Sequence, residues 1–442
     1  MKANRAPTGF QYKRKVGEVM KRKYRGWLVA ALVLNIMILL GYGIYRYGDT
    51  LPEKITIITG EEQKLSFRLP FSAEIEGESV GVLEVNRKPL AEGSIKIDLS
   101  DALTMEASEK TNATMEVKLF GIFPLKKVEI SAVSPQSVVV GGSAIGLHVE
   151  TDGILVLGTT TVIGEDKMTY EPAANRLKSG DYILEVNGQT MDEKEDLIKL
   201  LAESDGSTLQ CKIRRGKEVT ETAVTPVRTA DGSYKIGTWI RDDTQGIGTL
   251  TYITTDGKFG ALGHGITDVD TGVLMEVDGG NAYDAEILRI IKGEPGTPGE
   301  LSGVIHRSED ERLGTVSKNT AQGIFGTIKE NCKLRTGDRY YEIAFKQEVK
   351  KGKATILCEI NGCVNEYEIE IQQVDYSNKN HAKGLVLKIT DEELLELTGG
   401  IVQGMSGSQI IQNGKLIGAV THVFIRDSTK GYGTFIENML QN

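Results

Sequence analysis

Cysteine is scarce in this chain, and its scarcity excludes two kinds of protein. Four of the 442 residues are cysteine, which is too few for a fold held together by disulfides. None lies in a C-x-x-C pair or beside a histidine cluster, so we expect no zinc site, no other metal and no cofactor. Cys358 and Cys363 are close enough in sequence to pair across a turn, with buried free thiols as the alternative.

Positive charge is scarce after residue 25. The first 25 residues hold nine lysines and arginines and one acidic residue. Residues 26–442 hold 43 basic and 60 acidic side chains, a net charge of −17. Contacts to phosphates need clustered cations, so we expect this acidic body not to bind nucleic acid.

Long apolar runs are rare, and the one that stands out is "GWLVAALVLNIMILLGYGIY" at residues 26–45, with Asn35 as its one strongly polar member. About 20 such residues suffice to cross a bilayer as a helix. No small-x-small cleavage site follows, which favours an uncleaved anchor over a signal peptide. The sequence thus predicts a basic cytoplasmic segment at 1–25, a transmembrane signal anchor at 26–46, and an extracytoplasmic bulk.

Proline is scarce too, at 10 residues, whereas glycine is abundant, at 51. Many glycines between short alternating segments predict a mainly β protein. Residues 47–130 contain such segments and no catalytic constellation, so we expect a small β domain or stalk there. Residues 229–442 contain more than ten, which predicts a β-barrel or a pair of barrels.

Residues 131–228 resemble a PDZ domain of the bacterial protease type, on the pattern "LKSGDYILEVNGQ" at 177–189. In that family a glycine-rich loop presents backbone N–H groups to a peptide C-terminus, and a neighbouring strand pairs with the peptide. Here the loop would be "GGSAIGL" at 141–147, with a peptide-binding cradle of Ile145, Gly146 and Leu147. The amphipathic segment 194–204 would form the other wall of the groove. A loop without a binding role is the alternative.

Ser406 is the candidate nucleophile of the C-terminal module. It lies in "QGMSGS" at 403–408, where glycines allow a tight turn, and the N–H groups of Gly404 and Ser406 could form an oxyanion hole. An Asn-Gly pair at 413–414 predicts a hairpin after it, whose second strand could line a substrate groove. A small serine filling a corner of a β core is the alternative.

His264 is the best candidate for a general base among five histidines, because it stands between two glycines after an apolar strand. His422 alternates with apolar neighbours and is expected to be structural. The orienting acid stays open on these grounds. Asp391 heads a helix-like segment, where aspartate is an ordinary N-cap, and Asp268 and Asp270 follow the histidine closely.

Three segments of the C-terminal module carry a more specific resemblance. They are "GALGHGI" at 260–266, "LKITDEELLELTGGIVQGMSGSQIIQNGKLIGAVTHV" at 387–423 and "GYGTFIENML" at 431–440. Behind an anchor and a PDZ-like module, they resemble the stage IV sporulation protein B peptidases of endospore-forming bacteria. This resemblance implies a chymotrypsin-like β-barrel protease domain with a triad of His264, Asp391 and Ser406.

The resemblance also implies a role in sporulation signalling. Family members are membrane-anchored serine endopeptidases that act in the space between the two membranes around the forespore and cleave themselves. They also cleave a membrane-bound inhibitory partner, which releases an intramembrane metalloprotease that processes a mother-cell sigma factor. The PDZ-like module would bind a peptide C-terminus or an internal segment. The alternative is an exported peptide-binding scaffold with a degenerate protease domain.

Overall fold

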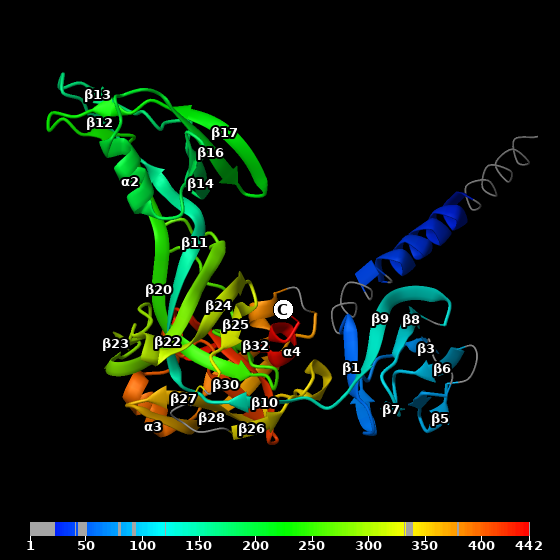
Figure 1. The fold of residues 1–442 in the computed structure, drawn as a ribbon. Coiled ribbons are helices and arrows are strands. Elements are labelled where there is room, and N and C mark those ends of the chain that lie inside the picture. Colours follow the sequence, from blue (N-terminus) through cyan, green and yellow to red (C-terminus); the bar gives the residue numbers. More distant parts are fainter. Residues whose placement is uncertain are drawn as a thin grey trace, which may run out of the picture. The chain divides into compact units, whose positions relative to one another are not determined.

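The protein is described by a computed structural model that covers residues 23–39, 41–42, 51–77, 81–90, 94–119, 121–330, 332, 339–377 and 380–441. The chain divides into two compact units, Met1–Val133 and Ser134–Asn442. In Figure 1 the first unit runs from blue to cyan and the second from cyan to red. Strands dominate the described residues, which confirms the prediction of a mainly β protein.

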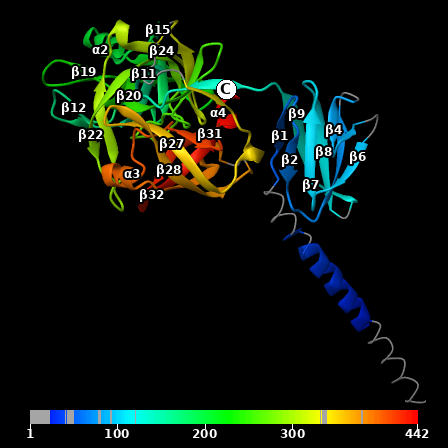
Figure 2. The same cartoon turned by 90° about the horizontal axis from the view of Figure 1, so that it is seen from below.

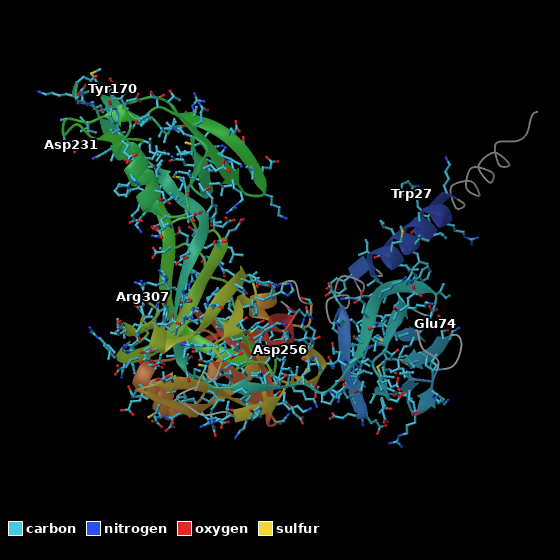
Figure 3. The ribbon with its side chains drawn as sticks, viewed as in Figure 1. Trp27, Glu74, Tyr170, Asp231, Asp256 and Arg307 are labelled. Carbon is cyan, nitrogen blue, oxygen red and sulfur yellow. The ribbon has the colours of Figure 1, made fainter. Side chains whose placement is uncertain are left out.

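Residues 23–39 are helical, and Trp27, labelled in Figure 3, is 78% exposed on this segment. The predicted anchor at 26–46 lies partly outside the described residues, because residues 40 and 43–46 are not among them. Within the described part of the chain, no helix combines the length and the apolar character that a membrane crossing requires. The anchor therefore stays a prediction from the sequence.

The first unit contains two small sheets around one apolar core. One sheet has the order β1 (Lys54–Ile58), β9 (Phe123–Val133), β8 (Asn112–Leu119), β3 (Ser72–Gly77) and β6 (Ser94–Asp98). The other has the order β2 (Gln63–Ser66), β7 (Ala102–Ala107), β4 (Leu83–Val85) and β5 (Lys88–Pro89). In β8, Ala113, Met115 and Val117 are buried and alternate with more exposed residues, as a half-buried strand requires.

The second unit contains a ring of six strands that pair back to the first. The order is β11 (Ala144–Thr159), β22 (Val277–Ile291), β24 (Arg312–Thr320), β25 (Gly323–Ile328), β21 (Lys258–Ala261) and β20 (Thr238–Ile253), and β20 pairs with β11. At its margins lie β10 (Ser137–Val140), β23 (Glu300–Ile305), η1 (Glu309–Glu311) and β26 (Arg339–Glu342). Buried aliphatic side chains and Phe259 fill this first ring.

A second ring is a closed barrel, drawn in orange and red in Figure 2. Its order is β27 (Gly352–Ile360), β28 (Cys363–Val374), β29 (Leu385–Ile389), β32 (Asp427–Phe435), β31 (Lys415–Phe424) and β30 (Gln409–Gln412). Four short helices accompany it, namely η2 (Lys346–Glu348), η3 (His381–Lys383), α3 (Glu392–Thr398) and α4 (Ile436–Met439). Asn413 and Gly414 both have positive φ angles, 52° and 76°, so the predicted β30–β31 hairpin turn is confirmed. Of the two predicted arrangements, one barrel or a pair, the two rings match the pair.

Residues 154–241, here called the PDZ-like module, have a separate apolar core and lie in sequence between the parts of β11 and β20 that belong to the first ring. The far ends of β11 and β20 pair with each other, and β11 also pairs with β14. The module adds β12 (Val162–Ile163), β13 (Thr169–Tyr170), β14 (Asp181–Val186), β15 (Gln189–Thr190), α2 (Lys194–Ala202), β16 (Leu209–Arg215), β17 (Glu218–Val224), β18 (Val227–Arg228) and β19 (Tyr234–Lys235). Its own apolar core includes Leu197 of α2 and Ile183 of β14.

The predicted boundary between a PDZ-like domain at 131–228 and a protease domain at 229–442 is corrected by this pairing. Strand β10 and residues 144–150 of β11 precede the module in sequence, yet they pair with β20, β22 and β26. They are therefore strands of the protease part. The module is an insertion between β11 and β20, which the order of motifs along the chain could not reveal.

The four cysteines are free thiols. Cys358 is buried in β27, where Asn365 of β28 lies opposite, whereas Cys363 is exposed. The considered pairing of Cys358 with Cys363 is therefore absent from the hairpin, and burial raises the pKa of the Cys358 thiol. Cys358 acts as a small apolar residue of the barrel core.

Truncation at the predicted boundary should prevent folding of the protease part. Residues 229–442 lack Ile145, Leu147 and Val149, which are at most 1% exposed in the first ring. Each contributes about 1.5–3 kcal/mol of burial, so their loss rivals the whole stability of an ordinary domain. We expect residues 134–442 to melt cooperatively by circular dichroism and residues 229–442 not to. Equal melting of the two fragments would contradict the insertion.

Candidate active site

Ser406 lies in a tight turn before β30. The backbone conformations on either side of it, at positions 404 and 407, favour glycine. Gly404 has a φ of +98° and Gly407 a φ of +94°, in the left-handed region. A Cβ on Gly407 would lie 2.2 Å from the Thr249 carbonyl oxygen, and one on Gly404 would lie 2.9 Å from Leu301 Cβ. Met405 between them is fully buried. The turn thus fixes Ser406 in place by backbone conformation and by one buried side chain.

Strand β20 of the first ring holds this turn of the second ring. The Thr249 N–H donates to the Ser406 carbonyl over 2.8 Å, and the Thr249 hydroxyl donates to the Gly404 carbonyl over 3.2 Å. Two residues on, the Thr251 hydroxyl donates to the Gly407 carbonyl over 2.9 Å. The nucleophile turn is therefore anchored on the barrel that carries the candidate base.

His264 follows β21 of the first ring and meets Ser406 from the other side. Its Nε2 lies 3.0 Å from Ser406 Oγ, within hydrogen-bond distance. Both side chains are half-buried. The structure thus brings together the predicted base and the predicted nucleophile, which are 142 residues apart in sequence.

The tautomer of His264 is set by its own loop. Nδ1 lies 2.9 Å from the carbonyl oxygen of Gly265, which can only accept a hydrogen bond. Nδ1 therefore carries the proton, and Nε2 presents its lone pair to Ser406. Burial lowers the pKa of His264 below its usual 6.5, and the Gly265 carbonyl offsets that shift in part. The ring is neutral at pH 7, as a general base must be.

Asp391, the acid implied by the family resemblance, does not contact His264. It caps α3, where one carboxylate oxygen accepts from the Leu394 N–H over 3.0 Å and the other from the Glu368 N–H over 3.2 Å. No hydrogen bond or ion pair of the described residues joins it to His264. The assignment of Asp391 as orienting acid is corrected accordingly, and the ordinary N-cap interpretation holds.

Asp268 and Asp270, the rival acids, are occupied as well. Both bind the guanidinium of Arg241, Asp268 at NH1 and Asp270 at NH2 over 2.8 Å. Neither forms a described contact with His264. The group that binds His264 Nδ1 is therefore the Gly265 backbone carbonyl and not a carboxylate. Every residue has such a carbonyl, so no sequence pattern predicts it.

The predicted oxyanion hole keeps its donors free. Among the described hydrogen bonds, the N–H groups of Gly404 and Ser406 donate to no acceptor, although their neighbours Met405 and Gly407 do. Free N–H groups at the nucleophile are what a developing oxyanion needs. Both predicted residues therefore remain candidates for this role.

Strand β31 lies beside the nucleophile, where a substrate wall was expected. Ser406 Oγ is 2.9 Å from the Thr421 carbonyl oxygen, a second acceptor for its proton. The ring centroid of His422, expected to be structural, lies 4.7 Å from that of His264. Partial burial, the nearby His264 and Lys383 lower the pKa of His422 to about 4, so this ring is also neutral at pH 7. His422 thus covers one face of the base.

The predicted peptide cradle is not where the sequence placed it. Ile145, Gly146 and Leu147 lie within β11, paired on one side with β20 and on the other with β22. Ile145 and Leu147 are at most 1% exposed, and a Cβ on Gly146 would lie 2.3 Å from Ile305. Backbone groups that are buried and paired on both edges cannot receive a peptide, so this prediction is wrong.

An apolar groove of about 750 Å³ lies elsewhere in the PDZ-like module. Its walls come from Leu197, Ile198 and Leu201 of α2, from Ile236 just before β20, and from Trp239 at the start of β20. Trp239 is 66% exposed and Ile198 is 56% exposed. Like residues 141–147, the segment around Ile236 has a glycine, Gly237, just before a strand. The sequence therefore held two such loops, and only their pairing tells them apart.

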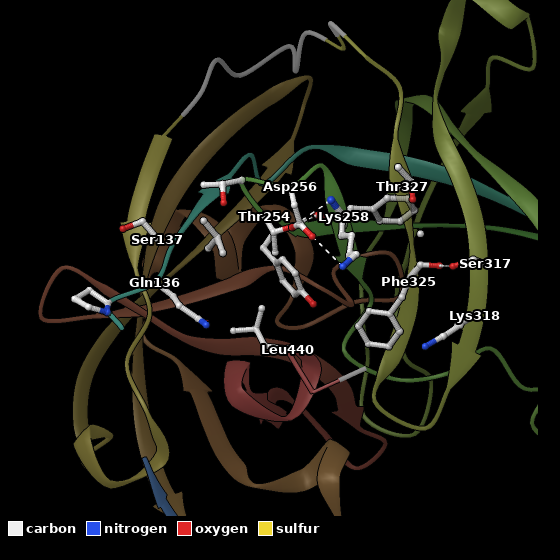
Figure 4. Close-up of a pocket in the computed structure, with 16 residues that line it drawn as sticks. Gln136, Ser137, Thr254, Asp256, Lys258, Ser317, Lys318, Phe325, Thr327 and Leu440 are labelled. Carbon is white, nitrogen blue, oxygen red and sulfur yellow. Dashed lines mark hydrogen bonds and ion pairs between the residues drawn. The ribbon is translucent and has the colours of Figure 1, made fainter. Parts of the chain in front are cut away.

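A cavity of about 790 Å³ lies away from the catalytic pair, and Figure 4 shows its lining. Asp256 binds the Thr254 hydroxyl over 2.6 Å and Lys258 over 2.9 Å at its rim. Neither Ser406 nor His264 lines it. Among the described residues, no group of histidines, cysteines and carboxylates is arranged to hold a metal ion. The pair that is arranged for acyl transfer is Ser406 and His264.

Comparisons with known proteins agree with this chemistry. Residues 232–440 match the family model of the SpoIVB peptidase S55 family, and no curated protein sequence matches the chain.

Three solved structures show local likenesses. The PDZ domain of the SdrC-like protein from Listeria monocytogenes is 22% identical, over 20% of this chain and 87% of that one, with a TM-score of 0.17. The Rv3671c protease from M. tuberculosis in its active form is 11% identical over 45% of this chain and 72% of that one, with a TM-score of 0.23. Its inactive form is 12% identical over 44% and 81%, with a TM-score of 0.25. At TM-scores this low, the likenesses add nothing to the fold established from strand pairing.

The matched family model spans both candidate residues. It runs from residue 232, just before β19, through α4 and includes His264, Ser406 and the turn between Gly404 and Gly407. From this match and from the contact between Ser406 and His264, residues 232–440 are identified as a SpoIVB-like serine peptidase domain.

Proposed function

We propose that the chain cleaves peptide bonds through a Ser406–His264 dyad. The 3.0 Å contact between Ser406 Oγ and His264 Nε2 carries this proposal. Ser406 Oγ attacks the substrate carbonyl carbon while its proton passes to Nε2, and the carbonyl oxygen becomes an oxyanion bound by the N–H groups of Gly404 and Ser406. Nε2 then returns the proton to the leaving amine, and water repeats the sequence on the acyl-enzyme. Proton transfer and oxyanion stabilisation contribute roughly 10²- to 10⁴-fold each.

The Gly265 carbonyl would take the place of the third catalytic residue. It accepts a hydrogen bond from Nδ1–H both before and after Nε2 is protonated, so the ring keeps its orientation through the cycle. A carbonyl carries a dipole but no net charge, so it stabilises the imidazolium less than a carboxylate does. Before attack, the hydroxyl of Ser406 must also turn its single proton from the Thr421 carbonyl toward Nε2.

The biological setting is proposed from the sequence. The apolar run at 26–45 and the basic segment before it support a single-pass membrane protein with its N-terminus in the cytoplasm. The family resemblance supports action between the forespore membranes, self-cleavage, and cleavage of a membrane-bound inhibitory partner that triggers sigma-factor processing. The apolar groove of the PDZ-like module would recruit substrate segments, by pairing with an extended peptide.

Covalent labelling by a fluorophosphonate tests the dyad and separates it from an exported scaffold with a degenerate protease domain. The wild-type chain should label at Ser406, and Ser406→Ala should not label. His264→Ala should label about 10²- to 10⁴-fold more slowly because it lacks the base. Asp391→Asn should label within about threefold of wild type, since asparagine is as good an N-cap. A loss in Asp391→Asn like that in His264→Ala would restore the triad, and an unlabelled, folded wild type would favour the scaffold.

The pH dependence of labelling should reflect the buried base. A base acts when neutral, so labelling falls as pH drops through the pKa of His264. Burial lowers that pKa below 6.5, and we therefore expect the midpoint of the acid limb below pH 6.5. Rate constants measured between pH 4 and 8, with circular dichroism at each pH as control for folding, give this midpoint. A midpoint above pH 6.5 would mean that a negative charge stabilises the imidazolium.

Self-cleavage of the full chain in membrane fractions tests the proposed setting and the groove. Wild type should release a large fragment on the exported side and leave its N-terminal region in the membrane, whereas Ser406→Ala should stay intact. Ile198→Glu places a charge in the apolar groove and should slow processing several-fold.

Val219→Glu is the matched control for the groove, because Val219 is 54% exposed on β17 of the same module and does not line the groove. It should process at the wild-type rate. Identical processing by wild type and Ser406→Ala would refute self-cleavage. Equal slowing by Ile198→Glu and Val219→Glu would contradict the proposal that the groove binds substrate.

A further inference from the structure

The loop that follows the base, residues 265–275, controls where the Gly265 carbonyl lies. It folds back on itself, with hydrogen bonds from the Asp268 N–H to the Val273 carbonyl over 2.9 Å and from the Met275 N–H to the Ile266 carbonyl over 3.0 Å. Between these bonds, Val269 is 87% exposed. A loop with so exposed a tip needs anchors at its base if its first carbonyl is to hold the imidazole.

One anchor comes from the first ring itself. The Asn319 side chain of β24 accepts from the Ile266 N–H over 2.9 Å and donates to the carbonyl oxygens of Ile266 and Met275 over 2.8 Å each. Asn319 thus ties the two ends of the loop together. Its hydrogen bonds do not reach the middle of the loop, which contains Asp268 and Asp270.

The second anchor comes from the PDZ-like module. Arg241 of β20 binds the Asp268 carboxylate through NH1 and the Asp270 carboxylate through NH2. Asp268 is 2% exposed and also accepts from the N–H groups of Thr271 and Asp270, over 2.8 and 3.1 Å. Burial raises the pKa of Asp268, but these N–H groups and Arg241 outweigh it and keep the carboxylate charged. A buried charge of this kind depends on its cation.

The module also holds the C-terminal side of the loop. The Glu276 N–H donates to the Tyr182 hydroxyl over 3.0 Å, and the Glu276 carboxylate lies 2.9 Å from the Arg214 guanidinium. Tyr182 and Arg214 belong to β14 and β16 of the module. Acidic side chains within the loop and at Glu276 just after it thus bind two arginines of the module.

We propose that Arg241 is a positioning residue for the peptidase. By bridging Asp268 and Asp270 it fixes the loop whose Gly265 carbonyl orients His264, and thereby keeps Nε2 aimed at Ser406. Arg241 touches neither substrate nor the reacting atoms, and it acts through His264. Its strand supports the role: two residues before it, Trp239 lines the apolar groove, and eight residues after it, Thr249 binds the Ser406 carbonyl.

The test measures the second-order rate constant of fluorophosphonate labelling in the full chain, and it rests on the proposed dyad. Arg241→Met keeps the length of the side chain but removes its charge, and we expect labelling at least about tenfold slower at equal folded fraction. Arg241→Lys keeps a cation beside Asp268 and so protects folding, but its single amine cannot form the planar two-carboxylate bridge. We expect its rate between those of Arg241→Met and wild type.

Arg215→Met is the matched control. Arg215 binds a carboxylate as buried as Asp268, that of Asp181, through two hydrogen bonds of 2.7 and 2.6 Å in the same module, and no described contact joins it to the loop. It should label within twofold of wild type. A second readout is the imidazole Nδ1–H proton resonance of His264, which should persist in Arg215→Met and broaden or vanish in Arg241→Met.

The outcomes separate this inference from the dyad itself. Wild-type labelling in folded Arg241→Met, or in Arg241→Lys if the methionine variant does not fold, would overturn the positioning role and leave the dyad intact. An equal loss in Arg215→Met would reduce the effect to general stability of the module. Absence of labelling in wild type would instead refute the dyad.

Discussion

The hydrogen bond from the Thr249 N–H to the Ser406 carbonyl joins two rings of strands that have separate cores. Ser406 belongs to the second ring and His264 to the first. The two side chains therefore meet only if the two rings are held in a fixed position relative to each other. The hydroxyls of Thr249 and Thr251 repeat the link on either side of the nucleophile. Three bonds to carbonyls of residues 404–407 leave that turn little freedom, and glycine at 404 and 407 makes the close approach possible.

Orientation of the base by a backbone carbonyl changes the electrostatics of the site. A carboxylate would both fix the tautomer and raise the pKa of the imidazole, whereas the Gly265 carbonyl fixes the tautomer with a smaller effect on the pKa. Burial then dominates and keeps His264 neutral. The charged groups that lie nearby in sequence, Asp268 and Asp270, form ion pairs with Arg241. These ion pairs hold the loop in its conformation.

The sequence predicted those parts of the site that depend on side-chain type. The glycines around Ser406, the histidine between glycines and the Asn413-Gly414 turn each require particular residues, and the structure has each where it was expected. Gly265 and Thr421 act through their carbonyl oxygens, which every residue possesses, so no pattern marks them. The peptide cradle failed for a different reason. Residues 141–147 have a binding loop's composition, and only pairing of β11 on both edges removes them from the surface.

The insertion of the PDZ-like module has a mechanical consequence. A domain appended by one flexible linker can turn freely about it, so events within the domain exert no force on its neighbour. This module is joined by two antiparallel strands, β11 and β20, which both continue into the first ring, although their pairing is irregular between Glu150 and Leu155. Two continuous strands restrict rotation of the module more than one flexible linker does, because both chain connections would have to bend together. Any rotation of the module must therefore bend two strands that belong to the catalytic ring, whereas a domain on one linker would turn about that linker alone.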